Sequence, residues 1–168
     1  MVRAGADLRV IGNAYWPSGK MRDMAIDRSG KWWRSETPDD LAEYLSAYTA
    51  DGYPVGPVRE SVCATCGGRV FGLRGDRDEG VGRRTCRSCG GKVFIADSQE
   101  NWADARPRTC KCPCGGADFN LAVGYSLREN GEVRWVTVAE RCTSCGVLGS
   151  FVDWGINYAP TLYLLEQS

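Results

Sequence analysis

The sequence contains no histidine among its 168 residues. Histidine is the most common general base in enzymes and the most common ligand of catalytic zinc. A hydrolytic zinc centre, with three protein ligands and a bound water, therefore has few candidate ligands in this chain. No catalytic constellation stands out among the remaining residue types, so we expect a protein that is not an enzyme.

Net charge and long apolar runs are also missing. Lys and Arg together number 21, and so do Asp and Glu, so no overall field favours nucleic acid or an anionic membrane. No apolar run approaches the roughly 18 residues of a membrane span. The first residues lack the apolar core of a secretory signal. We therefore expect a cytoplasmic protein with no membrane partner.

Cysteine, by contrast, is abundant. The chain has nine cysteines, and eight of them form four close pairs, each followed by glycine. The pairs are Cys63 and Cys66, Cys86 and Cys89, Cys112 and Cys114, and Cys142 and Cys145. Four thiolates hold Zn²⁺ in a closed tetrahedral site. A disulfide scaffold is disfavoured by the odd count, the short spacings and the missing signal. The pattern predicts two four-cysteine sites and two Zn²⁺ per chain.

The two sets of cysteines lie within two similar stretches of sequence. Phe71 follows Cys66 by five residues, as Phe119 follows Cys114. Ser88 and Ser144 occupy the same slot inside the later pairs. We interpret residues 59–97 and 110–154 as an internal duplication.

Repeated Cys-x-x-Cys-Gly knuckles on predicted hairpins resemble the zinc-ribbon superfamily, over residues 59–154. The resemblance implies a structural metal site in each ribbon and leaves the function open. By this resemblance the ligands of site one are Cys63, Cys66, Cys86 and Cys89, and those of site two are Cys112, Cys114, Cys142 and Cys145. Rubredoxins share the knuckle and hold iron, so iron is an alternative to zinc.

Site two departs from the family pattern. Its first knuckle is Cys-x-Cys, and Cys110 lies two residues further upstream. Cys110 is therefore an alternate ligand. Cys112 is favoured, because the glycine turn after Cys114 leaves it close to the metal.

The predicted fold class is mainly β: a small α+β N-terminal module followed by two tandem zinc β-ribbons. The module covers residues 1–58, the first ribbon 59–97, and the second, longer ribbon with its C-terminal tail 110–168. In the module we expect strands at 6–16, 21–27 and 31–34. A helix is predicted after them, with Thr37 as N-cap, Pro38 in its first turn and Gly52 as its stop. Its apolar stripe is Leu41, Tyr44, Leu45 and Tyr48. The apolar tail 161–166 should pack on the core.

The second ribbon carries a strong hairpin signal, Asn130-Gly131. A two-residue loop at this point pairs 129 with 132, 127 with 134, 125 with 136, 123 with 138, 121 with 140 and 119 with 142. One strand face is then apolar and must be buried: Leu121, Val123, Tyr125, Leu127, Val136 and Val138. The other face includes Val133 and Thr137, and we expect it to tolerate a charge at Thr137.

The function that these features favour is a non-enzymatic accessory or adaptor protein. Its two zinc ribbons would present a surface to a protein partner. Nucleic acid is the alternative partner, through a basic cluster on the first ribbon that Asp76, Asp78 and Glu79 interrupt. The cluster consists of Arg69, Arg74, Arg77, Arg83, Arg84, Arg87 and Lys92.

A minor alternative is redox or thiol chemistry. Cys110 lies near Arg106, Arg108 and Lys111, which could lower its pKa and make it a nucleophile that alkylating agents reach first. An iron-loaded electron carrier is the other form of this alternative.

Overall fold

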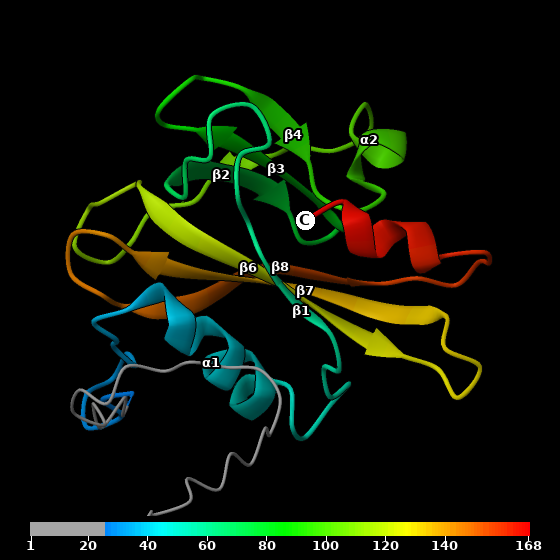
Figure 1. The fold of residues 1–168 in the computed structure, drawn as a ribbon, viewed down its shortest axis with the longest axis horizontal. Coiled ribbons are helices and arrows are strands. Elements are labelled where there is room, and N and C mark those ends of the chain that lie inside the picture. The colour runs from blue at the N-terminus through cyan, green and yellow to red at the C-terminus, as the bar shows by residue number, and fades with distance from the viewer. Residues whose placement is uncertain (1–25) are drawn as a thin grey trace, which may run out of the picture.

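A computed structural model describes residues 26–168 (Figure 1). The fold is mainly antiparallel β, which confirms the predicted fold class. The predicted strand 6–16 and most of 21–27 lie outside the described residues. The strands are β1 Val58–Glu60, β2 Phe71–Asp76, β3 Val81–Cys86, β4 Lys92–Phe94, β5 Arg108–Thr109, β6 Phe119–Leu127, β7 Val133–Cys142 and β8 Leu148–Gly155. The helices are α1 Leu41–Tyr48 and α2 Ser98–Asn101, with 3-10 turns η1 Pro38–Asp40 and η2 Leu162–Glu166.

All eight strands belong to one sheet. Its order is β4-β3-β2-β6-β7-β8, with β1 added to β6 and β5 added to β2. The strands β2, β3 and β4 repeat the path of β6, β7 and β8: a hairpin, then a return strand after the second cysteine pair. The two predicted ribbons thus contribute to one continuous sheet, in which β2 meets β6 at Phe71 and Phe119.

The predicted helix is present. Thr37 caps it, since its Oγ1 accepts a hydrogen bond of 3.3 Å from the Asp39 N–H. The first turn is a 3-10 turn, and the α-helix proper begins at Leu41. Leu41 and Leu45 are buried, whereas Tyr48, at the end of the stripe, is 48% exposed. The apolar side of α1 therefore packs through its first two turns.

The predicted strand 31–34 is wrong. Only Arg34 forms β-bridges, to Asp27 and to Val147. Beside the bridge from Arg34 to Val147, the Leu148 N–H of β8 donates to the Trp33 carbonyl at 2.8 Å. The segment reaches the sheet only at its end, so no ladder forms along the two tryptophans.

The predicted register of the long hairpin is confirmed along most of its length. Phe119 pairs with Cys142, Val123 with Val138, and Tyr125 with Val136. Near the loop the register shifts after Ser126, so the predicted pairs of 127 with 134 and of 129 with 132 are wrong.

The loop chemistry explains this shift. The Gly131 N–H donates to Arg128 O at 2.9 Å, and the Arg128 N–H donates to Glu132 O at 2.8 Å. Gly131 has φ +86°. This is a three-residue loop in which glycine takes the left-handed position, one residue longer than the predicted turn. Leu127 consequently pairs with Val133, which moves to the apolar face.

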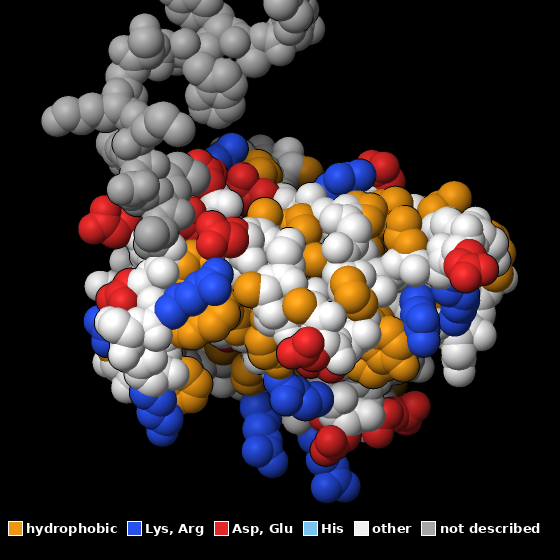
Figure 2. Space-filling view, turned by 90° about the horizontal axis from the view of Figure 1, so that it is seen from below, with side chains coloured by type: hydrophobic (Ala, Val, Ile, Leu, Met, Phe, Trp, Pro, Cys, Tyr) orange, Lys and Arg blue, Asp and Glu red, His pale blue; other side chains and the backbone are white. Residues whose placement is uncertain are grey.

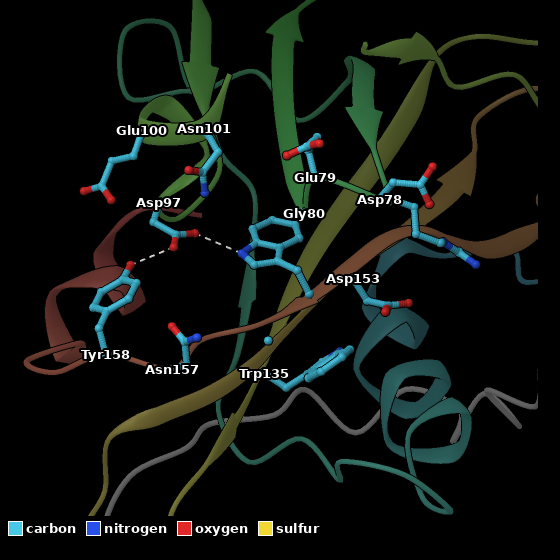
Figure 3. Close-up of a pocket in the computed structure, with 13 residues that line it drawn as sticks. Asp78, Glu79, Gly80, Asp97, Glu100, Asn101, Trp135, Asp153, Asn157 and Tyr158 are labelled. Carbon is cyan, nitrogen blue, oxygen red and sulfur yellow. Dashed lines mark hydrogen bonds between the residues drawn. The ribbon is translucent and has the colours of Figure 1, made fainter. Parts of the chain in front are cut away.

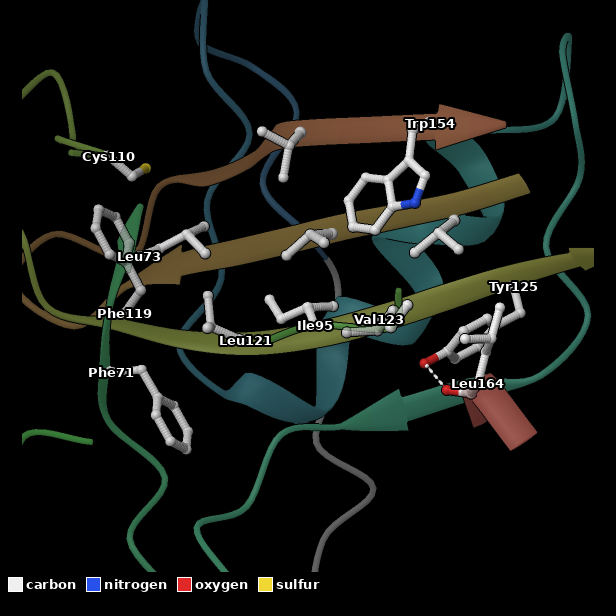
Figure 4. Close-up of a cluster of buried hydrophobic side chains, with 14 of the residues drawn as sticks. Phe71, Leu73, Ile95, Cys110, Phe119, Leu121, Val123, Tyr125, Trp154 and Leu164 are labelled. Carbon is white, nitrogen blue, oxygen red and sulfur yellow. Dashed lines mark hydrogen bonds between the residues drawn. The ribbon is translucent and has the colours of Figure 1, made fainter. Parts of the chain in front are cut away.

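The apolar face of β6 and β7 is buried as predicted. Figure 4 shows Leu121, Val123 and Tyr125 along β6, in the same buried cluster as Phe71 and Ile95. The tail closes this core: Leu164 is fully buried, and the Tyr125 hydroxyl donates to the Leu164 carbonyl at 2.9 Å. The predicted packing of the tail is confirmed, and the packed segment is the 3-10 turn η2.

The opposite face of the same strands is also buried. In Figure 1, α1 lies on one side of β6, β7 and β8, and the β2–β4 strands lie on the other. Leu45 of α1 packs with Ala122, Ala139 and Leu148 in a second, smaller cluster. Thr137 is only 2% exposed, so the expectation that this face tolerates a charge is wrong.

Candidate metal centres

The first cysteine set converges on one point. The Sγ atoms of Cys63, Cys66, Cys86 and Cys89 all lie within 4.8 Å of one another. The Sγ–Sγ distance is 3.5 Å from Cys63 to Cys89 and 3.5 Å from Cys66 to Cys86. A tetrahedron with Zn–S bonds of about 2.3 Å has S–S edges of roughly 3.8 Å. A disulfide needs about 2.05 Å. The four thiols therefore have the spacing of metal ligands.

The second set repeats this arrangement. Cys112, Cys114, Cys142 and Cys145 also lie within 4.8 Å of one another. Their Sγ–Sγ distances include 3.4 Å from Cys112 to Cys145 and 3.7 Å from Cys114 to Cys142. All nine cysteines are free thiols. Both sets fit zinc-ribbon-like sites.

The backbone of each knuckle explains why the thiols converge. A glycine N–H donates back to the carbonyl of the first cysteine in all four knuckles, at 2.8 or 2.9 Å. These glycines are Gly67, Gly90, Gly115 and Gly146, with φ of +73°, +76°, +89° and +76°. A side chain is strained at such φ values, so glycine is required where the chain reverses. The glycine after each pair, noted in the sequence, thus has a structural reason.

A further glycine lines each cluster from outside. A Cβ placed on Gly68 would lie 3.0 Å from Cys86 Sγ and 3.2 Å from Cys66 Sγ. A Cβ on Gly116 would lie 3.1 Å from Cys142 Sγ and 3.3 Å from Cys114 Sγ. The absence of a side chain here leaves the sulfur atoms room to meet.

Backbone N–H groups favour the thiolate form at one knuckle of each site. The Cys66 and Thr65 N–H groups lower the pKa of Cys63 to about 6. The Gly116 N–H, 3.4 Å from Cys114 Sγ, lowers the pKa of Cys114 to about 7. Burial raises the pKa of Cys112 and of Cys145 in the second site. Because metals bind the thiolate, these N–H groups support metal binding at neutral pH.

Cys110 lies outside both clusters. It is 3% exposed and belongs to the main core, and its N–H donates to Leu73 O at 2.8 Å, next to β5. Burial, and then the charge of Glu140, raise its pKa. The hypothesis of an activated Cys110 nucleophile is therefore wrong: the basic residues near it in sequence do not offset its desolvation. The structure brings Cys112, not Cys110, to the other three thiols of site two.

The predicted basic cluster is largely engaged within the chain. Arg84 is buried and donates to Ser168 O at 2.6 Å, and Arg83 stacks on Trp102 at 4.7 Å. The other contacts are Arg87 with Asp118 at 2.6 Å, Arg69 with Glu60 at 3.3 Å, Arg74 with Pro107 O at 2.9 Å and Arg77 with Ser150 O at 3.2 Å. These guanidinium groups hold the two ribbons and their linkers together.

An acidic groove of about 600 Å³ lies where the β2–β3 turn, α2 and β8 meet (Figure 3). Asp97 accepts hydrogen bonds from Trp154 Nε1 at 2.9 Å and from the Tyr158 hydroxyl at 2.7 Å. Sequence reasoning missed this groove because its residues are far apart in the chain. Asp97 fixes two aromatic side chains here, which is a structural role.

Sequence reasoning also missed Glu140. It is 9% exposed, and its Oε2 accepts a bond of 3.0 Å from the Phe151 N–H. Burial raises its pKa to about 8. A signal existed, because the predicted register places residue 140 opposite Leu121, on the face that must be buried.

No protein-family model matches this chain, and neither curated proteins nor solved structures include a match.

Proposed function

We propose that the chain holds one Zn²⁺ in each four-cysteine cluster and that it is a non-enzymatic adaptor of the zinc-ribbon type, built by internal duplication. The observation that carries this proposal is the pair of equivalent thiol clusters at the knuckles of one sheet. Four thiolates complete the shell of a structural zinc and leave no position for water. Cysteines that form no disulfide bonds suit a reducing compartment such as the cytoplasm.

In this function the metal acts as a cross-link. Each cluster ties the segment before a hairpin to the turn after it, and so fixes the open end of the hairpin. The free energy of binding such a structural zinc is on the order of 10–16 kcal/mol and becomes folding free energy. The two sites would thereby hold the sheet rigid enough to present a surface.

A protein partner is favoured over nucleic acid by the state of the basic residues. Most of the arginines in the predicted cluster already contact acceptors or aromatic rings of the chain, so few are free for phosphates. Apolar side chains are available instead, spread between charged ones on the face in Figure 2. The large exposed apolar residues are Trp32, Tyr48, Tyr53, Val62, Val93, Leu162 and Tyr163. Aromatic residues of this kind are enriched in protein interfaces.

Elemental analysis of the purified protein tests the metal. Two zinc ions per chain are expected, with loss of the circular-dichroism spectrum and of the thermal transition after chelation. One metal or none would overturn the two-site proposal. Iron with a visible charge-transfer band would replace it with the rubredoxin-like alternative.

The partner is tested by capture from the native host with nuclease-treated and untreated lysates. A protein that is retained after nuclease treatment supports the adaptor role. Binding that disappears with nuclease, or that falls steeply with salt in a direct nucleic-acid assay, would favour the nucleic-acid alternative.

A further inference from the structure

A pocket of about 440 Å³ lies beside site two, where the N-terminal segment, α1 and β8 meet the chain at residues 110–113. Its volume falls within the range of small-molecule sites, about 300–1,000 Å³. Most of its lining is apolar, and the few polar groups come from separate segments that converge on it. Pockets of this composition are the usual form of a ligand site.

One wall of the pocket is aromatic and held in place by contacts within the chain. Tyr44 and Tyr48 stack with their ring centroids 5.6 Å apart and their planes 19° apart. Trp33 meets Tyr44 edge to face at 5.8 Å, outside the pocket, and so fixes the base of the stack. Trp32 and Tyr48 remain 47% and 48% exposed. The wall is therefore ordered but not covered.

The base of the pocket holds two polar groups with unused hydrogen-bonding capacity. Oε2 of Glu140 binds the Phe151 N–H, where a register shift disrupts the β7–β8 ladder. Within residues 26–168, Oε1 of Glu140 has no hydrogen bond. It lies over Gly149, where a Cβ would come within 2.6 Å of it. The buried Oγ of Ser150 likewise finds no partner in the described chain.

The mouth of the pocket is cationic. Arg77 and Lys111 both line it. The Nη2 of Arg77 donates to the carbonyls of Ser150 and Phe151, each at 3.2 Å. These bonds fix the guanidinium beside the pocket base and leave its Nε and Nη1 without a partner in the described chain. A carboxylate can accept a charge-assisted hydrogen bond from one of these donors.

We propose that this pocket binds a small zwitterion of the amino-acid type with a large apolar side chain. The ammonium group donates to Glu140 Oε1 and Ser150 Oγ, and the carboxylate accepts from Arg77 and Lys111. The apolar side chain lies against Trp32 and Tyr48. Acceptors and cations that line the same pocket match the two polar groups of an amino acid.

Simpler ligands use only part of the pocket. An amine without a carboxylate brings no acceptor to Arg77, and a carboxylate without an amine adds no partner for Glu140 Oε1. A pocket filled by water alone leaves the aromatic wall without an apolar contact. The zwitterion brings an acceptor to Arg77, a donor to Glu140 Oε1 and an apolar contact to the aromatic wall. This inference goes beyond the adaptor function and does not depend on it.

Calorimetric titration of the full-length, zinc-loaded chain tests the ligand class. The probes are L-phenylalanine, phenethylamine, 3-phenylpropionate and glycine. L-Phenylalanine is expected to bind at least tenfold more tightly than each of the other three. Equal binding by phenethylamine or 3-phenylpropionate would overturn the zwitterion, and no binding by any probe would overturn the pocket as a site of this class.

Two variants and a matched control locate the binding. Glu140→Gln keeps an oxygen for the Phe151 N–H but replaces the Oε1 acceptor with an amide donor, and Tyr48→Ala truncates an exposed ring. Each should weaken L-phenylalanine binding at least fivefold while zinc content stays at the wild-type value. Tyr163→Ala, at a ring of 45% exposure outside the pocket, should leave it unchanged. Unchanged binding in Tyr48→Ala, or equal loss in Tyr163→Ala, would overturn the assignment. The zinc measurement separates this result from a failure of the metal sites.

Discussion

Phe71 pairs directly with Phe119, and this bridge joins the strands of the two ribbons. Each phenylalanine also pairs, on its other side, with the first cysteine of its own second knuckle: Phe71 with Cys86, and Phe119 with Cys142. Three backbone pairs, Cys86 with Phe71, Phe71 with Phe119 and Phe119 with Cys142, therefore connect one thiol cluster to the other. Both phenylalanine rings are buried. The two metal sites are parts of one body.

This connection predicts that Phe71→Ala weakens both halves of the sheet. Both rings are 1% exposed, so truncation should reduce the free energy of unfolding by about 3–5 kcal/mol. Both zinc ions, including the one in site two, should then pass faster to a chromophoric chelator. Tyr163→Ala, at an exposed ring, serves as the control. Faster release from site one alone would show that the bridge does not couple the sites.

Site two offers a test of ligand choice between neighbouring cysteines. Cys112→Ser should release one zinc, because Cys112 Sγ lies with the other three thiols. Cys110→Ala should keep both, because Cys110 is a core residue outside the cluster. In the folded, zinc-loaded protein Cys110 should also resist alkylation, since it is buried and its pKa is raised. Zinc loss in the Cys110 variant with retention in the Cys112 variant would reverse the assignment.

The glycines that line the clusters predict a steric effect on metal affinity. Gly116→Ala places a Cβ 3.1 Å from Cys142 Sγ and 3.3 Å from Cys114 Sγ, closer than ordinary van der Waals contact, so the thiols must shift. We expect zinc affinity at site two to fall by about tenfold, or about 1.4 kcal/mol. Gly52→Ala is the matched control, because a Cβ there meets nothing within 4 Å. Competition with a chelator of known affinity measures both, and equal affinities would refute the steric account.

The burial of both faces of the long hairpin predicts two costly substitutions side by side. Val138→Asp puts an unpaired carboxylate into the main core, and Thr137→Asp puts one on the opposite buried face, beside Gly124, where a Cβ would lie 3.3 Å from Leu45 of α1. Each should cost about 3 kcal/mol or more in denaturant unfolding. Arg134→Ser, at an exposed position on the same strand, should cost less than about 1 kcal/mol. A mild effect at Thr137 would mean that α1 does not cover this face.

The raised pKa of Glu140 predicts that Glu140→Gln stabilises the protein by an amount that depends on pH. The pKa of Glu140 is raised to about 8 in the folded state from 4.5, so the folded state holds a proton that the unfolded state has lost between these values. Stability therefore falls as pH rises through this window, and the penalty is complete above the folded pKa. Glu140→Gln should stabilise the protein by about 2 kcal/mol or more at pH 8.5 and by much less at pH 5.

The comparison with wild type at each pH cancels the competition between protons and zinc for the thiols. Glu132 supplies a control, because its pKa is shifted in the opposite direction to that of Glu140. Hydrogen bonds from the Thr161 hydroxyl and N–H lower its pKa. Glu132→Gln should therefore destabilise the protein at neutral pH. A stabilisation by Glu140→Gln that does not depend on pH would contradict the assigned shift.

The features predicted correctly from sequence depend on local patterns. Short cysteine spacings with following glycines place four thiols together because each knuckle closes on itself. The register near Phe119 is determined jointly by the hairpin and by the need to bring two knuckles together. The helix that starts at Thr37 has its own cap and stripe.

The features that were missed depend on how segments dock. The segment before the first ribbon was expected to be a separate module, so nothing in the pattern of β6 and β7 indicated that α1 would cover Thr137. The pocket beside Glu140 combines residues from separate elements between Trp32 and Phe151 and has no local signature. The loop at Gly131 was one residue longer than predicted because Asn-Gly fits more than one hairpin turn.

The order of synthesis determines how long α1 and β1 remain without the strands that they pack against. The ribosome completes α1 and β1 before it begins β6, the strand that β1 joins and α1 covers. The first cysteine set can close while Leu41 and Leu45 still lack the surface that buries them. Until β8 is made, the nascent chain thus carries a finished knuckle pair and an uncovered apolar helix, the kind of segment that chaperones bind.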